Sequence, residues 1–197
     1  MQKRTLAILL AAICASTVIT ATSSSVTAEA AQAIPTQVVA SELTGLPIST
    51  ALASQRPVAI MIDNDTRALP HYGLAEADVV YEMMNSTANN RVTRLMALYK
   101  DWHGVGQIGN IRSTRPTNIL LAAEWNALLV HDGGPFYNKP YFKSTGIAHL
   151  SGGFSRVKNG KATEFTEYAI GTDISRKAAS AKISASYSST DAQSAAQ

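Results

Sequence analysis

A helix followed at once by a strand, over residues 116–131, is the feature that most constrains the fold of this chain. Apolar residues occupy most of the helical wheel over 117–125, which predicts a helix packed on a sheet rather than one lying at the surface. The apolar run 127–131 then has the composition of a strand. Because strands are also expected before the helix, the sequence predicts an α/β or α+β domain with a single mixed sheet, packed helices and an irregular C-terminal part.

Three further strands are expected ahead of this helix. The run 57–62 is short, apolar and bounded by turn formers, as a buried strand would be, and 79–84 and 92–99 have strand composition. A seven-residue loop between the last two would place Glu82 opposite Arg94 in an antiparallel hairpin. Such a pair among apolar neighbours is retained for specificity or function, or else is an ordinary cross-strand salt bridge.

The first 33 residues have the features of a secretory signal peptide. Lys3 and Arg4 precede an apolar run over 6–21. That run is interrupted by threonines and is too short for a comfortable membrane span, although a retained N-terminal anchor is the alternative. Ala-x-Ala sites end at Ala30 and Ala33. Cleavage there predicts a protein that is secreted or associated with the cell envelope, outside the cytoplasmic membrane.

Cysteine usage and charge exclude some classes of function. Cys14 is the one cysteine of the chain and lies in the apolar run, so a cleaved protein would have no disulfide and no thiol chemistry. A lipid anchor on Cys14 is the minority alternative, because the residue before a lipidated cysteine is small and Ile13 is bulky. The formal net charge of +3 falls slightly when the signal peptide is removed. Such a small excess predicts no nucleic-acid partner.

One domain is expected beyond the signal peptide. Residues 34–55 are rich in Ala, Ser, Thr and Pro with little periodicity, which predicts a flexible spacer. The domain is expected to cover 56–183 and to end with a helix over 173–182. Ser- and Ala-rich residues 184–197 are expected to be disordered. The sequence carries no indication of the oligomeric state.

Two arginines and two hydroxyl groups lie where the 117–125 helix begins. A proline suits the first helical position, and Ser113 or Thr114 can cap the first turn. Arg112 and Arg115 add full charges to the partial positive charge of the helix start. The alternative is a pair of solvated arginines. The predicted anion site consists of Arg94, Arg112, Ser113 and Arg115.

Polar residues near strand ends are candidates for chemistry. Asp63 or Glu82 can act as general acid or base and His131 as proton carrier, in a hydrolase or transferase acting on an envelope glycan or phosphodiester. The structural alternative makes Asp63 a turn former and His131 a hydrogen-bonded core residue. A metal site would use Asp63, Asp65 and His131 as ligands. Such a pattern arises often by chance, so no metal and no cofactor is predicted.

Several of these motifs together resemble a known family. They are the runs 56–64, 73–82, 93–94, 111–116 and 130–134, which read RPVAIMIDN, GLAEADVVYE, TR, IRSTRP and VHDGG. In order and spacing they resemble the YerB-like family of exported bacterial lipoproteins, a domain of unknown function. The resemblance implies a location near the cell envelope and no established reaction.

The chain departs from the family pattern at several positions. Asn110, Thr114 and Asp132 stand where relatives tend to have other residues, and a late Pro-His-Asn run is replaced near 166–168. Relatives also continue into a second, smaller domain.

Two classes of function compete for these residues. A binding module would hold an anionic envelope polymer or a small anionic ligand, with the membrane contacted only through the export signal or a lipid anchor. An enzyme should gather Asp63, Glu82 and His131 within hydrogen-bond reach of one cleft. A binding module needs only the arginines on an open surface.

Overall fold

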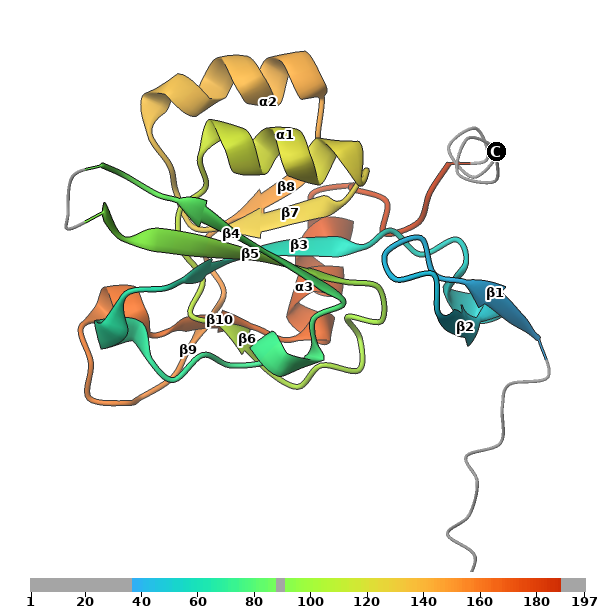
Figure 1. Cartoon of the computed structure of the whole chain (residues 1–197), viewed down its shortest axis with the longest axis horizontal. Helices are drawn as coiled ribbons and strands as arrows, with labels where there is room; N and C mark the ends of the chain where they lie inside the picture. Colours follow the sequence, from blue (N-terminus) through green and yellow to red (C-terminus); the bar gives the residue numbers. More distant parts are fainter. Residues whose placement is uncertain (1–36, 88–90, 189–197) are drawn as a thin grey trace, which may run out of the picture. The chain divides into compact units, whose positions relative to one another are not determined.

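A five-stranded mixed sheet organises the domain (Figure 1). The computed structural model describes residues 37–87 and 91–188, so Cys14, Ala30 and Ala33 lie outside the described residues. In spatial order the strands of the main sheet are β4 (Val79–Met84), β5 (Thr93–Tyr99), β3 (Val58–Asp63), β7 (Leu128–His131) and β8 (His149–Ser151). The strands expected at 57–62, 79–84, 92–99 and 127–131 are confirmed, with ends shifted by one residue at most.

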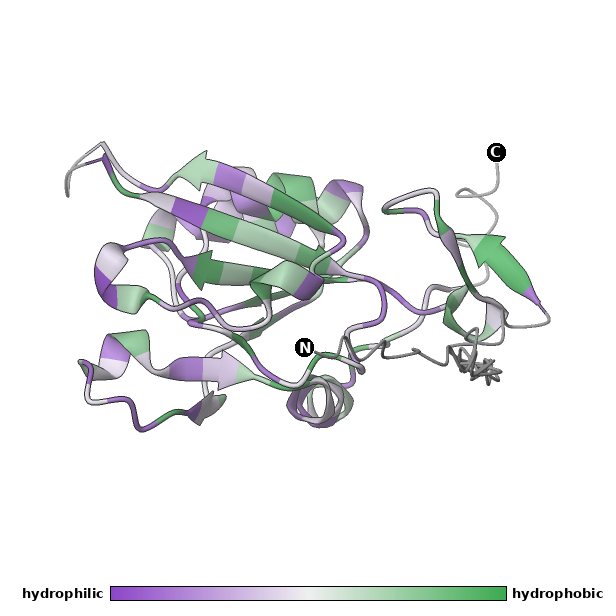
Figure 2. Ribbon diagram, turned by 60° about the horizontal axis from the view of Figure 1, so that its bottom comes forward, coloured by the Kyte–Doolittle hydropathy of each residue, from purple (hydrophilic) through white to green (hydrophobic). Residues whose placement is uncertain are grey.

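The main sheet combines two kinds of pairing. β4 pairs with β5 and β5 with β3 in antiparallel fashion, whereas β3 pairs with β7 and β7 with β8 in parallel. Every residue of β3 is buried, because both faces of the sheet are covered. Figure 2 shows the resulting apolar centre of the sheet.

Helices cover one face of the sheet. α1 (Pro116–Glu124) and α2 (Lys139–Thr145) lie on the same side in Figure 1. Ile119 and Ala122 of α1 pack against Met61 and Met96 of the sheet, as the expectation of a packed helix over 117–125 required. Within residues 37–87 and 91–188, no helix combines the length and the apolar character that crossing a bilayer needs.

A second sheet and a third helix cover the opposite face. The sheet consists of β6 (Ile108–Gly109), β10 (Glu167–Ala169) and β9 (Ser155–Arg156), and α3 (Gly171–Ser180) follows it. The mixed α/β class is confirmed, and the structure adds this sheet and a short hairpin to the expected one. Short 3-10 turns connect the elements: η1 (Thr50–Leu52), η2 (Thr66–Ala68), η3 (Leu74–Glu76), η5 (Phe136–Asn138) and η6 (Thr163–Phe165).

The expected spacer contains secondary structure. β1 (Val38–Ala40) and β2 (Pro47–Ser49) pair in a hairpin, and Leu43 between them is buried. The expectation of a flexible segment is therefore wrong over the hairpin. Strands of three residues are too short to show a periodicity in sequence.

The beginning of the expected disordered tail is also ordered. The backbone N–H of Arg56 donates to the carbonyl of Ala185 at 2.9 Å, and that of Tyr187 donates to the carbonyl of Ser54 at 2.8 Å. The prediction of disorder is wrong for these residues, because the tail pairs with a segment more than 100 positions away in sequence. Residues 189–197 lie outside the described part.

The expected pairing of Glu82 with Arg94 is wrong by one position. Met84 lies opposite Thr93, so Glu82 faces Leu95 and Arg94 faces Met83. A shift of one residue turns a side chain to the other face of a sheet. Glu82 is therefore on the exposed face of β4, and Arg94 is buried on the face that carries α1.

Candidate functional site

The carboxyl end of β3 brings two arginines to one carboxylate. The β3–β5 register places Arg94 directly across from Asp63. On the other side, residues 110–112 run along β3, where the N–H of Arg112 donates to the carbonyl of Met61 at 3.0 Å. In open α/β sheets, ligands bind beyond the carboxyl ends of the strands. The backbone thus places charged side chains at an edge suited to binding.

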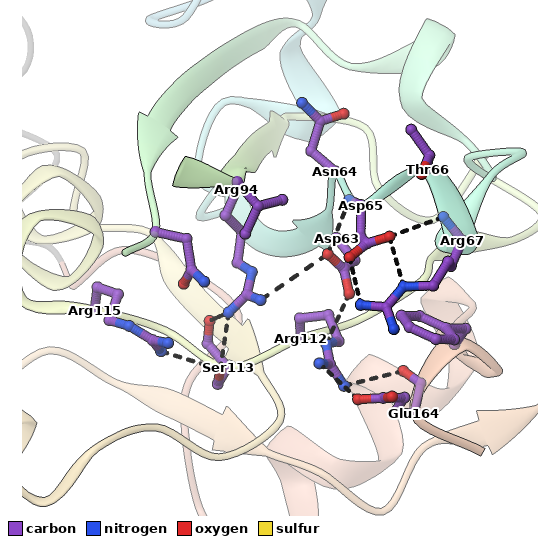
Figure 3. Close-up of a pocket in the computed structure, with 13 residues that line it drawn as sticks. Asp63, Asn64, Asp65, Thr66, Arg67, Arg94, Arg112, Ser113, Arg115 and Glu164 are labelled. Atoms are coloured by element: carbon purple, nitrogen blue, oxygen red, sulfur yellow. Dashed lines mark hydrogen bonds and ion pairs between the residues drawn. The ribbon is translucent and has the colours of Figure 1, made fainter. Parts of the chain in front are cut away.

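A polar hollow of about 740 Å³, which we name the arginine pocket, lies at this edge (Figure 3). Four arginines and three carboxylates line it, which leaves one net positive charge. Its lining residues are Asp63, Asn64, Asp65, Thr66, Arg67, Asn85, Val92, Arg94, Arg112, Ser113, Arg115, Glu164 and Phe165.

Arg112 is held by two carboxylates. Its Nε lies 2.8 Å from Asp63 Oδ2, and its Nη2 donates to Glu164 Oε2 at 3.0 Å. The guanidinium also lies over the ring of Phe165, 5.6 Å from its centroid. The charge of Arg112 is therefore largely compensated within the protein.

A second ion pair within the protein, between Arg67 and Asp65, also lines the arginine pocket. Arg67 donates from Nε to Asp65 Oδ1 at 3.0 Å and from Nη2 to Oδ2 at 2.7 Å. These bonds, joined by one from the Arg67 backbone, lower the pKa of Asp65 to about 2. Asp65 in turn donates its N–H to Asp63 Oδ1 at 3.1 Å. Both aspartates therefore act in the turn that shapes the pocket.

Arg94 is a buried cation with a distant counter-charge. Its residue is only 5% exposed, and its Nη1 donates to the carbonyl and to Oγ of Ser113, both at 2.8 Å. The Asp63 carboxylate lies 4.0 Å from Nη2, and Nε has no hydrogen-bond partner among the described residues. Burial lowers the pKa of Arg94 to about 10, and the nearby Arg115 and Arg112 act in the same direction. Arg94 is still charged at neutral pH.

Arg115 points at the same serine. Its Nη1 donates to Ser113 Oγ at 3.0 Å and to the Thr114 carbonyl at 2.9 Å. In the described parts of the chain, no carboxylate lies within 4.0 Å of its guanidinium nitrogens. Figure 3 shows Arg94 and Arg115 converging on Ser113. We name these three residues the serine–arginine cluster.

The start of α1 differs from the expected anion cradle. Pro116 is the first helical residue as expected, but Arg115 occupies the N-cap position and its N–H donates to Asn118 Oδ1 at 3.1 Å. The N–H of Thr114 donates to the Gly133 carbonyl at 3.2 Å. Capping by Ser113 or Thr114 is therefore wrong, because Ser113 Oγ accepts from guanidinium groups instead. Because these two backbone N–H groups already have partners, an anion at this site would meet the arginine side chains instead.

The three candidate catalytic residues lie in separate surroundings. Asp63 lines the arginine pocket and is paired with Arg112. Glu82 is on the exposed face of β4, where its Oε1 accepts from Thr93 Oγ1 at 2.6 Å and from Asn64 Nδ2 at 3.2 Å. His131 does not line the pocket. The structure does not gather these groups in one cleft.

His131 belongs to a buried aromatic cluster under α2. Its Nδ1 donates to the Gly133 carbonyl at 2.8 Å, so its Nε2 accepts from Nδ1 of His149 at 3.0 Å in the neutral ring. Phe142 stacks on both imidazoles. Burial lowers the pKa of His131 to about 4 and also lowers that of His149. Among residues 37–87 and 91–188, no three His, Cys, Asp or Glu side chains are grouped so as to hold a metal ion.

Sequence reasoning missed part of the pocket. Arg67 lies two residues after Asp65, and this short spacing was a local signal for a side-chain bond across the turn. Glu164 and Phe165 come from η6, which joins β9 to β10, about fifty residues after Arg112. No local pattern indicates that they approach it.

Sequence comparisons relate this chain to a protein family and to a curated protein. The family described as "Protein of unknown function (DUF3048) N-terminal domain" matches residues 43–184. A curated relative, "Putative lipoprotein YerB" of Bacillus subtilis strain 168, is 29% identical over 110 residues, which are 56% of this chain and 32% of the relative.

A solved structure shows the same architecture. The crystal structure of YerB protein from Bacillus subtilis matches with a TM-score of 0.67 at 24% identity, covering 75% of this chain and 51% of that one. At this identity the match establishes the fold alone. The chain thus spans about half of the crystallised relative and a third of the curated one. With most of its length matched by the family, the chain belongs to the DUF3048 proteins of unknown function and carries their N-terminal domain.

Proposed function

We propose that this domain is a binding module for a phosphate- or carboxylate-bearing component of the cell envelope, held by the serine–arginine cluster. The observation that carries the proposal is the electrostatic state of Arg94, which is buried while its nearest carboxylate is 4.0 Å away. A buried charge without close compensation is costly, so an oxyanion entering the pocket would meet donors that the protein leaves under-used.

The chemistry of arginine suits this ligand class. The planar guanidinium matches carboxylate and phosphate oxygens with two parallel hydrogen bonds. Arg115 has no carboxylate within 4.0 Å among the described residues. Its side chain is therefore the one best able to turn toward an incoming anion. Arg112 contributes less, because Asp63 and Glu164 already occupy it.

The envelope location rests on the relative and on the sequence. A relative named as a lipoprotein and the signal-like residues 1–33 both favour a domain that works outside the cytoplasmic membrane. The enzyme alternative has less support, because Asp63, Glu82 and His131 have separate partners.

Titration of the mature chain with inorganic phosphate, pyrophosphate and acetate tests the proposal. We expect calorimetric binding of at least one of these anions and a rise in the unfolding temperature. Arg115→Ala should weaken binding about 10-fold to 100-fold, since hydrogen bonds to charged groups contribute about 1.5–3 kcal/mol. The affinity of Arg115→Lys should lie between that of the parent and that of Arg115→Ala. The charge stays, but the two parallel hydrogen bonds of the guanidinium are lost.

Arg176→Ala is the matched control. Arg176 is an exposed arginine on α3 that pairs with Asp173 and takes no part in the pocket. Equal loss in Arg115→Ala and Arg176→Ala would mean that anions bind through general charge, and the pocket would lose its assignment. Absence of binding for all three anions would refute the proposal.

A further inference from the structure

Three exposed aromatic rings on η5 and α2 are unaccounted for by the arginine pocket. Phe136 is 81% exposed, the most of any large hydrophobic residue in the described part of the chain, and Tyr137 and Tyr141 are 47% and 37% exposed. Single exposed apolar residues are common, but three within six positions form a patch that calls for a partner. We name these three residues the aromatic ridge.

The segment of sequence that carries the ridge contains charged residues of one sign only. Residues 133–163 contain no Asp or Glu, yet they include five basic residues. Two of these, Lys139 and Lys143, are exposed and alternate with the aromatic rings along η5 and α2. Within the described residues neither lysine has a carboxylate within 4.0 Å. The ridge therefore presents apolar rings beside uncompensated positive charge.

Inward-facing side chains of η5 and α2 hold the aromatic ridge on the domain. Buried Asn138 donates from Nδ2 to the Thr114 carbonyl at 3.0 Å, and Phe142 stacks on His149 with ring centroids 4.0 Å apart. The inner side chains of η5 and α2 thus face the protein, while the aromatic ridge remains outside. Figure 1 shows α2 at the outside of the helical layer. The exposed rings are held outward on a packed support.

We infer that the aromatic ridge docks this domain on the surface of an anionic lipid bilayer. Aromatic rings gather at the boundary between headgroups and acyl chains, and neighbouring lysines are attracted to anionic lipid. A soluble polymer offers no apolar phase for Phe136. A stable protein partner needs about 800 Å² on each side, whereas the aromatic ridge consists of three side chains. The inference does not rest on anion binding in the arginine pocket.

Vesicle binding of the mature chain tests the inference. Co-sedimentation should show binding to phosphatidylcholine vesicles that contain about one third phosphatidylglycerol, and much weaker binding to phosphatidylcholine alone. The double variant Phe136→Ala/Tyr137→Ala should lower the partition coefficient at least about tenfold, the effect of withdrawing one large ring from an apolar phase. Lys139→Gln/Lys143→Gln should abolish most of the preference for the anionic vesicles.

Leu46→Ala is the matched control. Leu46 is 64% exposed on the β1–β2 hairpin, so the control removes an apolar side chain of similar exposure elsewhere. It should bind vesicles like the parent, and all variants should keep the parental unfolding temperature.

Several outcomes would overturn the inference. They are absence of binding to anionic vesicles, equal loss in the Leu46 control, and a ridge that instead mediates dimerisation or binding of a soluble wall polymer. The phosphate titration separates this proposal from the previous one. Phe136→Ala/Tyr137→Ala should keep anion binding, and Arg115→Ala should keep most vesicle binding.

Discussion

Lys100 and Arg94 are both buried cations at opposite ends of β5, but the protein treats their charges differently. Lys100 is 1% exposed, and its ammonium group donates to Glu42 at 2.6 Å and to the Gln55 carbonyl and lies over the Tyr187 ring. Arg94 is 5% exposed and has its carboxylate at 4.0 Å. Lys100 is thus surrounded by partners within the protein, whereas Arg94 lines the arginine pocket. Burial of a charge thus marks a candidate site only when the counter-charge is incomplete.

Removing the counter-charge of Lys100 is the strongest way to test this contrast. Glu42→Ala should destabilise the domain by about 3 kcal/mol, because buried Lys100 loses the carboxylate that pairs with it. Chemical denaturation would measure the loss. Asp101→Ala, an exposed acid next to Lys100, should change stability by less than about 0.5 kcal/mol. A small effect of Glu42→Ala would mean that water compensates Lys100, and the contrast with Arg94 would disappear.

An added anion should stabilise the protein through Arg94, which lines the arginine pocket, and not through Lys100, which is already paired with Glu42. At a phosphate concentration of 100 times Kd, the parent should gain about 2.7 kcal/mol of stability, and Arg115→Ala should gain much less at the same concentration. Glu42→Ala should keep the full gain despite its lower stability. Thermal unfolding at constant ionic strength gives all three values. Equal gains in the parent and in Arg115→Ala would place the anion elsewhere.

His131 provides a pH test of a closed polar cluster. Burial holds its pKa at about 4 in the folded protein, below the ordinary value of 6.5. Between these values the unfolded chain binds a proton that the folded protein does not, so stability falls as pH falls from 6.5 to 4. This single group should contribute about 2.5 kcal/mol over that range. His131→Gln should reduce this pH dependence, which chemical denaturation at a series of pH values would measure.

The smallest expected effect concerns the two faces of the β4–β5 hairpin. Glu82 and Arg94 lie on opposite faces, so Glu82→Gln and Arg94→Met should have additive effects on stability, within about 0.5 kcal/mol. By contrast, Asp63→Asn and Arg112→Met should couple, because their charged groups lie 2.8 Å apart. A coupling between Glu82 and Arg94 above that limit would contradict the observed register.

Much of the main sheet was predictable because its strands are short apolar runs, which can be recognised from a few neighbouring residues. The run that became β3 is buried on both faces, and such strands have a strong signature at short range. The hairpin register was not predictable, since a single residue in the loop decides which face carries Arg94. The N-terminal hairpin was missed because its strands have only three residues each.

The sequence by itself determined the fold class, the helix that starts at Pro116 and the gathering of arginines near its start. Those features depend on periodicity and on residue types a few positions apart. Only the tertiary structure decided how the charges are shared. Asp63 and Glu164 compensate Arg112, while Arg94 and Arg115 converge on Ser113. Electrostatic interactions depend on distances in space between segments far apart in the chain, which no local pattern encodes.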